Sequence, residues 1–174
     1  MSDYDPKQLA EEILAFIAER DSIQLATRDK SNHLNISYAP YAVVGEHFYI
    51  LISQLAQHCN NLLDVPELSL MLIEDEAQCK NPFARKRLTY QSVARRIDRD
   101  SELWDEGIEA LTTRFGPFVK QLAALGDFIM FRLTARDGLY IKGFGRAFSL
   151  SDKSLADVLH LVGRDNREQN KNTG

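Results

Sequence analysis

The chain has 174 residues, of which 44% are hydrophobic and 26% charged, and its formal net charge is −4. This length and composition favour one domain with a substantial core and argue against global disorder. The negative balance argues against nonspecific nucleic-acid binding, which needs an excess of cations. The chain starts without the apolar run of a signal peptide, no segment has membrane-spanning length, and Cys59 and Cys79 form no CxxC motif, so we expect a cytoplasmic protein.

The first half of the chain predicts a helix followed mainly by strands. Asp5 and Pro6 are typical of an N-cap and a first helical residue, and Pro66 ends a second helical segment, because it disfavours helix at the residue before it. The expected elements are a helix to Arg20, strands at 22–27, 33–38 and 47–52, a helix at 53–64 and a central strand at 68–73.

The second half predicts a long strand, two helices, a hairpin and a last helix. Turn residues at 135–138 predict the hairpin, and glycines at 143 and 145 predict a bend. The expected elements are a strand at 87–97, a helix from Ser101 to Arg114, a short helix to Leu125, hairpin strands at 127–134 and 139–142, a continuing edge at 143–148 and a terminal helix at 151–162.

This order of elements predicts a mainly β fold. Hairpin-linked strands separated by short helices favour an antiparallel β-barrel that is closed or partly closed, with flanking helices. We expect one domain over residues 1–165 and a polar C-terminal tail over 166–174.

Three adjacent cations, Arg85, Lys86 and Arg87, open the long strand after an acidic cluster at 74–76. Alternate strand residues point to opposite faces, so the three cannot all face the core, and burying an unpaired charge is costly. They could hold an anion, since a guanidinium chelates carboxylate or phosphate. They could also pair with the acidic cluster across a solvated loop, and the residues alone favour that loop.

Three further side chains are candidate site residues. His58 could be a ligand or an anion donor, although a lone histidine is more often a surface or satisfied residue. Asp127 could orient a water or an imidazole, but the residues alone favour a strand-entry aspartate that hydrogen-bonds a turn. His160 would gain from the dipole near the end of the terminal helix, and a neutral imidazole also suits haem iron.

Generic catalytic motifs are missing from the sequence. It contains no GxSxG, HExxH or P-loop pattern. The segment Gly143-Phe144-Gly145 lacks the third glycine of a dinucleotide-binding fingerprint and does not open a helix.

Several blocks of the chain nevertheless resemble a known family. The blocks are Tyr38-Ala39-Pro40, residues 83–89, residues 99–104, Arg114-Phe115-Gly116, residues 127–133 and residues 142–147. Together they resemble the HugZ/HutZ haem-utilisation family within the pyridoxamine-phosphate-oxidase-like FMN-binding split-barrel superfamily. The resemblance covers roughly residues 8–162.

The resemblance implies a homodimer of split barrels with haem sites at the subunit interface. In some members haem is broken down with oxygen and an electron donor, which releases iron. On this reading Arg85, Lys86 or Arg87 neutralises the haem propionates and Phe144 lines the pocket. Asp127 orients a water or the axial ligand, and His160 is the candidate iron ligand.

Two departures from the family pattern keep alternatives open. Flavin-using relatives carry a lysine where this chain has His58, and a neutral imidazole is a poorer phosphate partner. An FMN-dependent oxidoreductase is therefore the alternative, beside a non-catalytic haem carrier. Haem-degrading relatives place an axial histidine near Asp165, and a carboxylate binds haem iron more weakly. His160 could substitute, another ligand could serve, or degradation could be lost.

Overall fold

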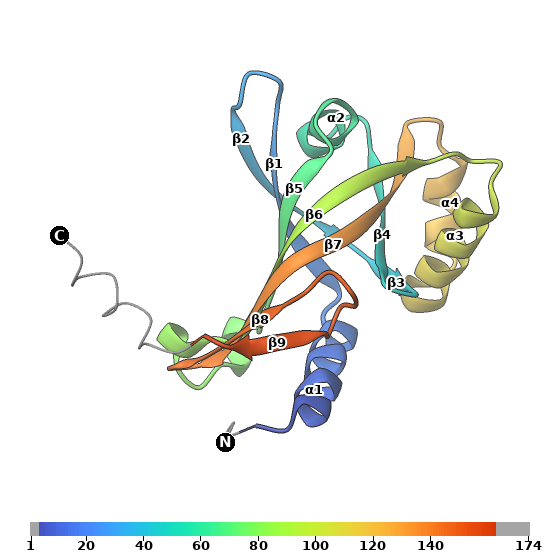
Figure 1. The fold of residues 1–174 in the computed structure, drawn as a ribbon. Coiled ribbons are helices and arrows are strands. Elements are labelled where there is room, and N and C mark those ends of the chain that lie inside the picture. The colour runs from blue at the N-terminus through green and yellow to red at the C-terminus, as the bar shows by residue number, and fades with distance from the viewer. Residues whose placement is uncertain (1–3, 163–174) are drawn as a thin grey trace.

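The computed structural model describes residues 4–162 (Figure 1). Its elements are α1 (Pro6–Glu19), β1 (Ser22–Arg28), β2 (Leu34–Pro40), β3 (Ala42–Val44), β4 (His47–Ser53), α2 (Gln57–Asp64), β5 (Glu67–Ile73), two 3₁₀ turns (Glu76–Gln78 and Pro82–Ala84), β6 (Arg87–Ile97), α3 (Glu102–Phe115), α4 (Phe118–Ala124), β7 (Phe128–Gly143), β8 (Arg146–Leu150) and β9 (Val158–Leu161). The predicted polar tail at 166–174 lies outside the described residues.

Within this range, nine strands form a single antiparallel sheet that curls into a half-open barrel (Figure 1). The strand order is β2-β1-β5-β6-β7-β4-β3, with β8 added to β7 and β9 added to β8. The predicted antiparallel, partly closed barrel with flanking helices is confirmed. Among residues 4–162, no helix combines the length and the apolar character that a membrane span requires.

Helix α1 forms as predicted and packs on the barrel core. The Asp5 carboxylate accepts a hydrogen bond from the backbone N–H of Lys7 at 2.9 Å, which satisfies one of the free donors of the first turn. The buried face of the helix carries Leu9, Ile13, Phe16 and Ile17. These side chains join the inward residues of the central strands in one hydrophobic cluster.

Helices α3 and α4 cover a second cluster on the other side of β4 and β7. Trp104, Tyr49 and Met130 are buried there. Gly107 of α3 allows the close approach, because a β-carbon at this position would lie 2.5 Å from Met130 Sδ and 2.7 Å from Tyr49 Cδ1.

We therefore expect Gly107→Ala to lower the free energy of unfolding by about 1–3 kcal/mol, because overpacking outweighs the better helix propensity of alanine. Urea unfolding measures this change. Gly126→Ala is the control, since a β-carbon there meets nothing within 4 Å. Equal stabilities for the Gly107 variant and the unsubstituted protein would contradict the close packing of α3.

The predicted hairpin at 127–142 is wrong, because this segment is the single strand β7 of 16 residues. Both of its halves pair with β6: residues 138–141 face 87–90 and residues 130–135 face 92–97. Between them the register shifts, and Gln91 of β6 faces two residues of β7. A bulge therefore absorbs the turn-forming residues at 136–137, so the chain does not reverse direction there.

The predicted terminal helix at 151–162 is also wrong. The segment makes a turn closed by Ser151 N–H donating to the Asp157 carbonyl oxygen at 2.9 Å, and then forms β9. In β9, His160 pairs with Ser149 and Leu161 with Phe148 of β8. Pairing satisfies the backbone groups along β8, which a helix would leave without partners.

Candidate functional site

The face of the sheet that points away from the barrel core is called the outer face here. One row of register partners crosses it from β2 to β9: Tyr38, Gln24, Met71, Thr89, Leu139, Ser149 and His160. Partners directly opposite in antiparallel strands project to the same face. This row therefore places His160 on the same surface as the central strands.

The β2 end of the outer face exposes large apolar side chains. Leu34, Ile36 and Tyr38 are 84%, 77% and 67% exposed. Beside them a hollow of about 420 Å³ is lined by Ile36, Met71 and Thr89 among others. Contiguous exposed apolar surface of this kind marks a contact site.

The three adjacent cations point in three directions. Arg85 lies in the loop before β6, where its guanidinium donates to the carbonyl oxygen of Glu74, from Nε at 3.1 Å and also from Nη2. It also lies 3.9 Å from a carboxylate oxygen of Glu76. The paired-loop interpretation of the sequence therefore holds for Arg85.

Lys86 and Arg87 point to opposite faces, because they are neighbours at the start of a strand. Lys86 is on the α1 side, where its charge acts on the carboxylate of Glu12. Arg87 is on the outer face as the register partner of Ile73 and Ile141. Within residues 4–162 its guanidinium makes one hydrogen bond, to the Arg85 carbonyl oxygen at 3.4 Å. Of the three cations, Arg87 is the one available to an anion on the outer face.

Glu12 neutralises the cations on the α1 side. Its carboxylate accepts hydrogen bonds from Tyr140 at 2.9 Å and from Lys142. Burial alone would raise the pKa of the Glu12 carboxyl. The hydrogen bonds from Lys142 and Tyr140 and the charges of Lys142 and Lys86 outweigh burial and hold this pKa below its ordinary value.

A carboxyl with a depressed pKa stabilises the fold above its unfolded pKa, and the stabilisation is lost as the pH falls through the folded value. We expect Glu12→Gln to cost about 1–2 kcal/mol near neutral pH. The difference from the unsubstituted protein should shrink below about pH 4.5, where the carboxyl of the unfolded chain is protonated. Urea unfolding across this pH range checks the prediction, and a difference that does not depend on pH would contradict it.

Asp127 is held at the opposite end of β7 by the turn between β4 and α2. Its Oδ2 accepts a hydrogen bond from Ser53 Oγ at 2.5 Å, and its backbone carbonyl oxygen accepts one from the N–H of Gln54 at 2.8 Å. The Leu55 N–H donates to Ser53 Oγ at 3.1 Å, which fixes the hydroxyl. This clamp orients the carboxylate, and Oδ1 has no hydrogen-bond partner among residues 4–162. The sequence analysis missed Ser53, since its partner is 74 residues away in the chain.

His58 lies in the first turn of α2, shortly after this clamp, and is half-buried. Burial lowers the pKa of its imidazole below the ordinary value. The side chain is therefore neutral near pH 7. A neutral imidazole suits metal ligation better than phosphate binding.

His160 and Phe144 occupy different faces at the β8 and β9 end. His160 is exposed on the outer face, with Nδ1 3.0 Å from Ser149 Oγ. It lies three strands from Arg87, which corresponds to about 15 Å. Phe144 lines a hollow of about 330 Å³ on the α1 side with Tyr4, Lys142 and Arg146 among others. Phe144 and Arg87 therefore lie on opposite sides of the sheet within one copy.

The predicted site residues thus lie in separate groups. Asp127 and His58 are near the start of β7, whereas Arg87 pairs near its end. A strand of 16 residues runs roughly 50 Å along its path, so a single copy cannot bring Asp127 to Arg87. Among residues 4–162, no three His, Cys, Asp or Glu side chains gather as a metal site.

Comparisons with known proteins agree with the fold and the motifs. Residues 9–142 match the family described as pyridoxamine 5'-phosphate oxidase. The chain belongs to this family. Within it, the haem oxygenase HutZ of Vibrio cholerae is 46% identical over 154 residues, which are 88% of each chain. The predicted resemblance to HutZ-type members is confirmed.

Solved structures of this family share the fold. The crystal structure of HutZ from Vibrio cholerae, described as a haem storage protein, has a TM-score of 0.74 and 47% identity, covering 79% of this chain and 96% of that chain. ChuZ from Campylobacter jejuni has a TM-score of 0.79 and 25% identity, covering 93% of this chain and 68% of that chain. The split barrel is therefore the fold of this HutZ-type chain.

Proposed function

We propose that this HutZ-type protein binds haem in haem-iron utilisation, in sites shared between two copies of the chain. One observation carries the proposal: the outer face joins an exposed apolar surface to an available guanidinium, Arg87, and a clamped carboxylate, Asp127, lies at the far end of β7. A haem presents a flat apolar ring, carboxylate groups and an iron. The 46% identity to the haem oxygenase HutZ supports the same ligand.

The exposed apolar side chains of this face support a homodimer. Exposed apolar side chains at its β2 end suit burial against a second copy. In a two-fold dimer the same patch meets itself with the copies reversed. Reversal brings the Asp127 end of one copy toward the Arg87 end of its partner. The separation within one chain, which excludes a site inside one copy, therefore supports a site between copies.

The side chains fit haem in the following way. Arg87 donates paired N–H groups to a propionate. Asp127, with Oδ1 free and Oδ2 fixed by Ser53, accepts a hydrogen bond from a water or an axial imidazole. The bound haem supplies the iron chemistry that degradation requires.

The iron ligand has two candidates. His160 is exposed on the outer face, with Nδ1 3.0 Å and Nε2 3.5 Å from Ser149 Oγ, so a metal would compete with this hydroxyl for a ring nitrogen. The axial histidine position of haem-degrading relatives falls at or near Asp165, which lies outside the described residues. A histidine at this position should bind iron more tightly than the carboxylate does.

Haemin titration followed by the Soret band tests the proposal. We expect a protein-bound spectrum for the unsubstituted chain and a haem affinity at least about tenfold lower for Arg87→Gln. Arg96→Gln is the matched control, because Arg96 is an exposed arginine of the same strand that is paired with core-facing Phe131. Asp165→His should strengthen binding, and His160→Ala should weaken it if His160 is the ligand. A spectrum equal to that of free haemin at excess protein rejects haem binding.

Two further measurements separate the alternatives. With ascorbate as electron donor under air, an oxygenase forms biliverdin-like products, whereas the Soret band of a carrier persists. A carrier or store is a real alternative, since the HutZ structure is described as a haem storage protein. Release of FMN on denaturation would identify the flavin oxidoreductase instead. The neutral His58 at the phosphate position argues against that outcome.

A further inference from the structure

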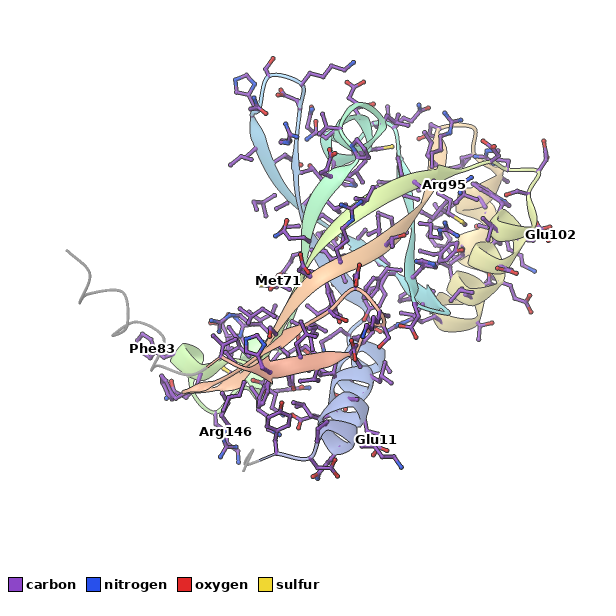
Figure 2. The ribbon with its side chains drawn as sticks, in the orientation of Figure 1. Glu11, Met71, Phe83, Arg95, Glu102 and Arg146 are labelled. Atoms are coloured by element: carbon purple, nitrogen blue, oxygen red, sulfur yellow. The ribbon has the colours of Figure 1, made fainter. Side chains whose placement is uncertain are left out.

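Two further arginines form a pair on the outer face, away from Arg87. Arg95 of β6 and Arg132 of β7 are direct register partners, so their β-carbons lie about 5 Å apart on the same face. Figure 2 labels Arg95 at the end of β6 that runs toward α3 and α4. Arg87 is eight residues earlier on the strand, roughly 26 Å away.

No carboxylate in the described part of the chain neutralises this pair. Neither Arg95 nor Arg132 takes part in an ion pair within residues 4–162. Glu67, on the neighbouring strand β5, lies 3.9 Å from Arg28 instead. The Nε of Arg132 is buried and has no hydrogen-bond partner in this range.

Such an arrangement is unfavourable without a further partner. Like charges directly opposite in a sheet destabilise it, and a buried donor of a charged group loses its hydration without compensation. His47 lies on the next strand, with Nδ1 3.3 Å from Thr134 Oγ1. Burial, and then the charge of Arg132, hold the pKa of His47 below its ordinary value, so this neighbour favours its neutral form beside the two arginines and supplies them with no negative charge.

We propose that Arg95 and Arg132 form a binding site for the oxyanion group of a small molecule, a phosphate or a carboxylate. Two guanidinium groups side by side can chelate such a group with parallel N–H donors. The bound anion would relieve the repulsion across the β6–β7 ladder and give the Arg132 Nε–H an acceptor. This site is distinct from the proposed haem contact at Arg87.

Inorganic phosphate is the probe that tests the site. The full chain is titrated with sodium phosphate at constant ionic strength, with chloride as the balancing anion. Binding is followed by the thermal midpoint and by the NMR signals of the arginine Nε–H groups. We expect phosphate to raise the midpoint and to shift the Arg132 signal. Arg95→Gln and Arg132→Gln should each weaken phosphate binding about tenfold or more.

Controls and competing ligands decide between sources of the anion. Arg96→Gln should leave phosphate binding unchanged, and Arg132→Lys should keep the charge but weaken binding, since lysine lacks the planar fork. Acetate added in place of phosphate distinguishes a carboxylate site from a phosphate site by the relative affinities.

Three results would overturn the proposal. The first is a thermal midpoint and a set of arginine Nε–H signals that change with neither phosphate nor acetate. The second is loss of the phosphate response in Arg87→Gln, which would place the anion at the haem contact. The third is a change of dimer mass in Arg132→Gln without any response to phosphate, which would mean that a carboxylate of a second copy neutralises the pair. Because the phosphate titration needs no haem, a failed haemin titration would leave the test of the Arg95 and Arg132 site unaffected.

Discussion

Ile36→Glu is expected to give a monomer that no longer binds haem tightly. Ile36 is 77% exposed in the middle of the apolar β2 surface. In a two-fold interface the substitution enters twice, and both carboxylates would be buried among apolar groups at high cost. We expect the dissociation constant of the dimer to rise on the order of a thousandfold. Sedimentation velocity measures the mass, and the haemin titration is repeated on the same sample.

Phe118→Glu is the control for this prediction. Phe118 is 60% exposed on α4, which lies on the other side of the molecule from β2 (Figure 1). The same added charge at this position should leave the mass and the haem affinity unchanged. A dimeric Ile36→Glu variant with full haem affinity would contradict a haem site that needs two copies.

The elements that could be predicted from the sequence are those with local signals. Asp5 and Pro6 predict the start of α1, and Ser101 predicts the start of α3, because a capping side chain bonds within its own turn. The alternation along β6 predicts its buried and outer faces for the same reason. These signals depend on neighbours in the chain, and at these elements the tertiary contacts agree with them.

The elements predicted wrongly depend on distant strands. Residues 135–138 have turn chemistry, but both flanking segments pair with β6, and a bulge takes up the extra residues. Residues 155–162 have helical periodicity, yet pairing with β8 turns their end into a strand. In both places, backbone hydrogen bonds to a partner far away in sequence outweigh the local preference.

The candidate site shows the same limit. Three consecutive cations leave an anion site and a self-paired loop both open, and they do not indicate which cation would serve each. Lys86 and Arg87 point to opposite faces of the sheet because they are neighbours at the start of a strand. The guanidinium of Arg85 is bound to the Glu74 carbonyl oxygen. Asp127 is recognisable from the family motif, whereas its clamp by Ser53 appears only when β4 and β7 pair. The separation of Asp127 from Arg87 likewise becomes visible only once β7 is one strand.

Mixing two weakened variants is expected to restore haem sites. In the proposed dimer each site uses Arg87 of one copy and Asp127 of its partner. Arg87→Gln and Asp127→Asn should each weaken haem binding about tenfold or more in their own homodimers. A mixed dimer has one site with both substitutions and one site with neither. After random exchange of subunits, about a quarter of all sites should bind haem with the original affinity.

The controls make this outcome specific to a shared site. If Arg87 and Asp127 acted within one chain, every copy in the mixture would carry one defect and no tight site would form. Mixing Arg87→Gln with the double variant Arg87→Gln/Asp127→Asn should also restore nothing, because no copy then supplies Arg87. Haemin titration of each mixture after unfolding and joint refolding gives the fraction of tight sites. A mixture without that fraction, in a sample that refolds to dimers, would reject the shared site while leaving haem binding itself intact.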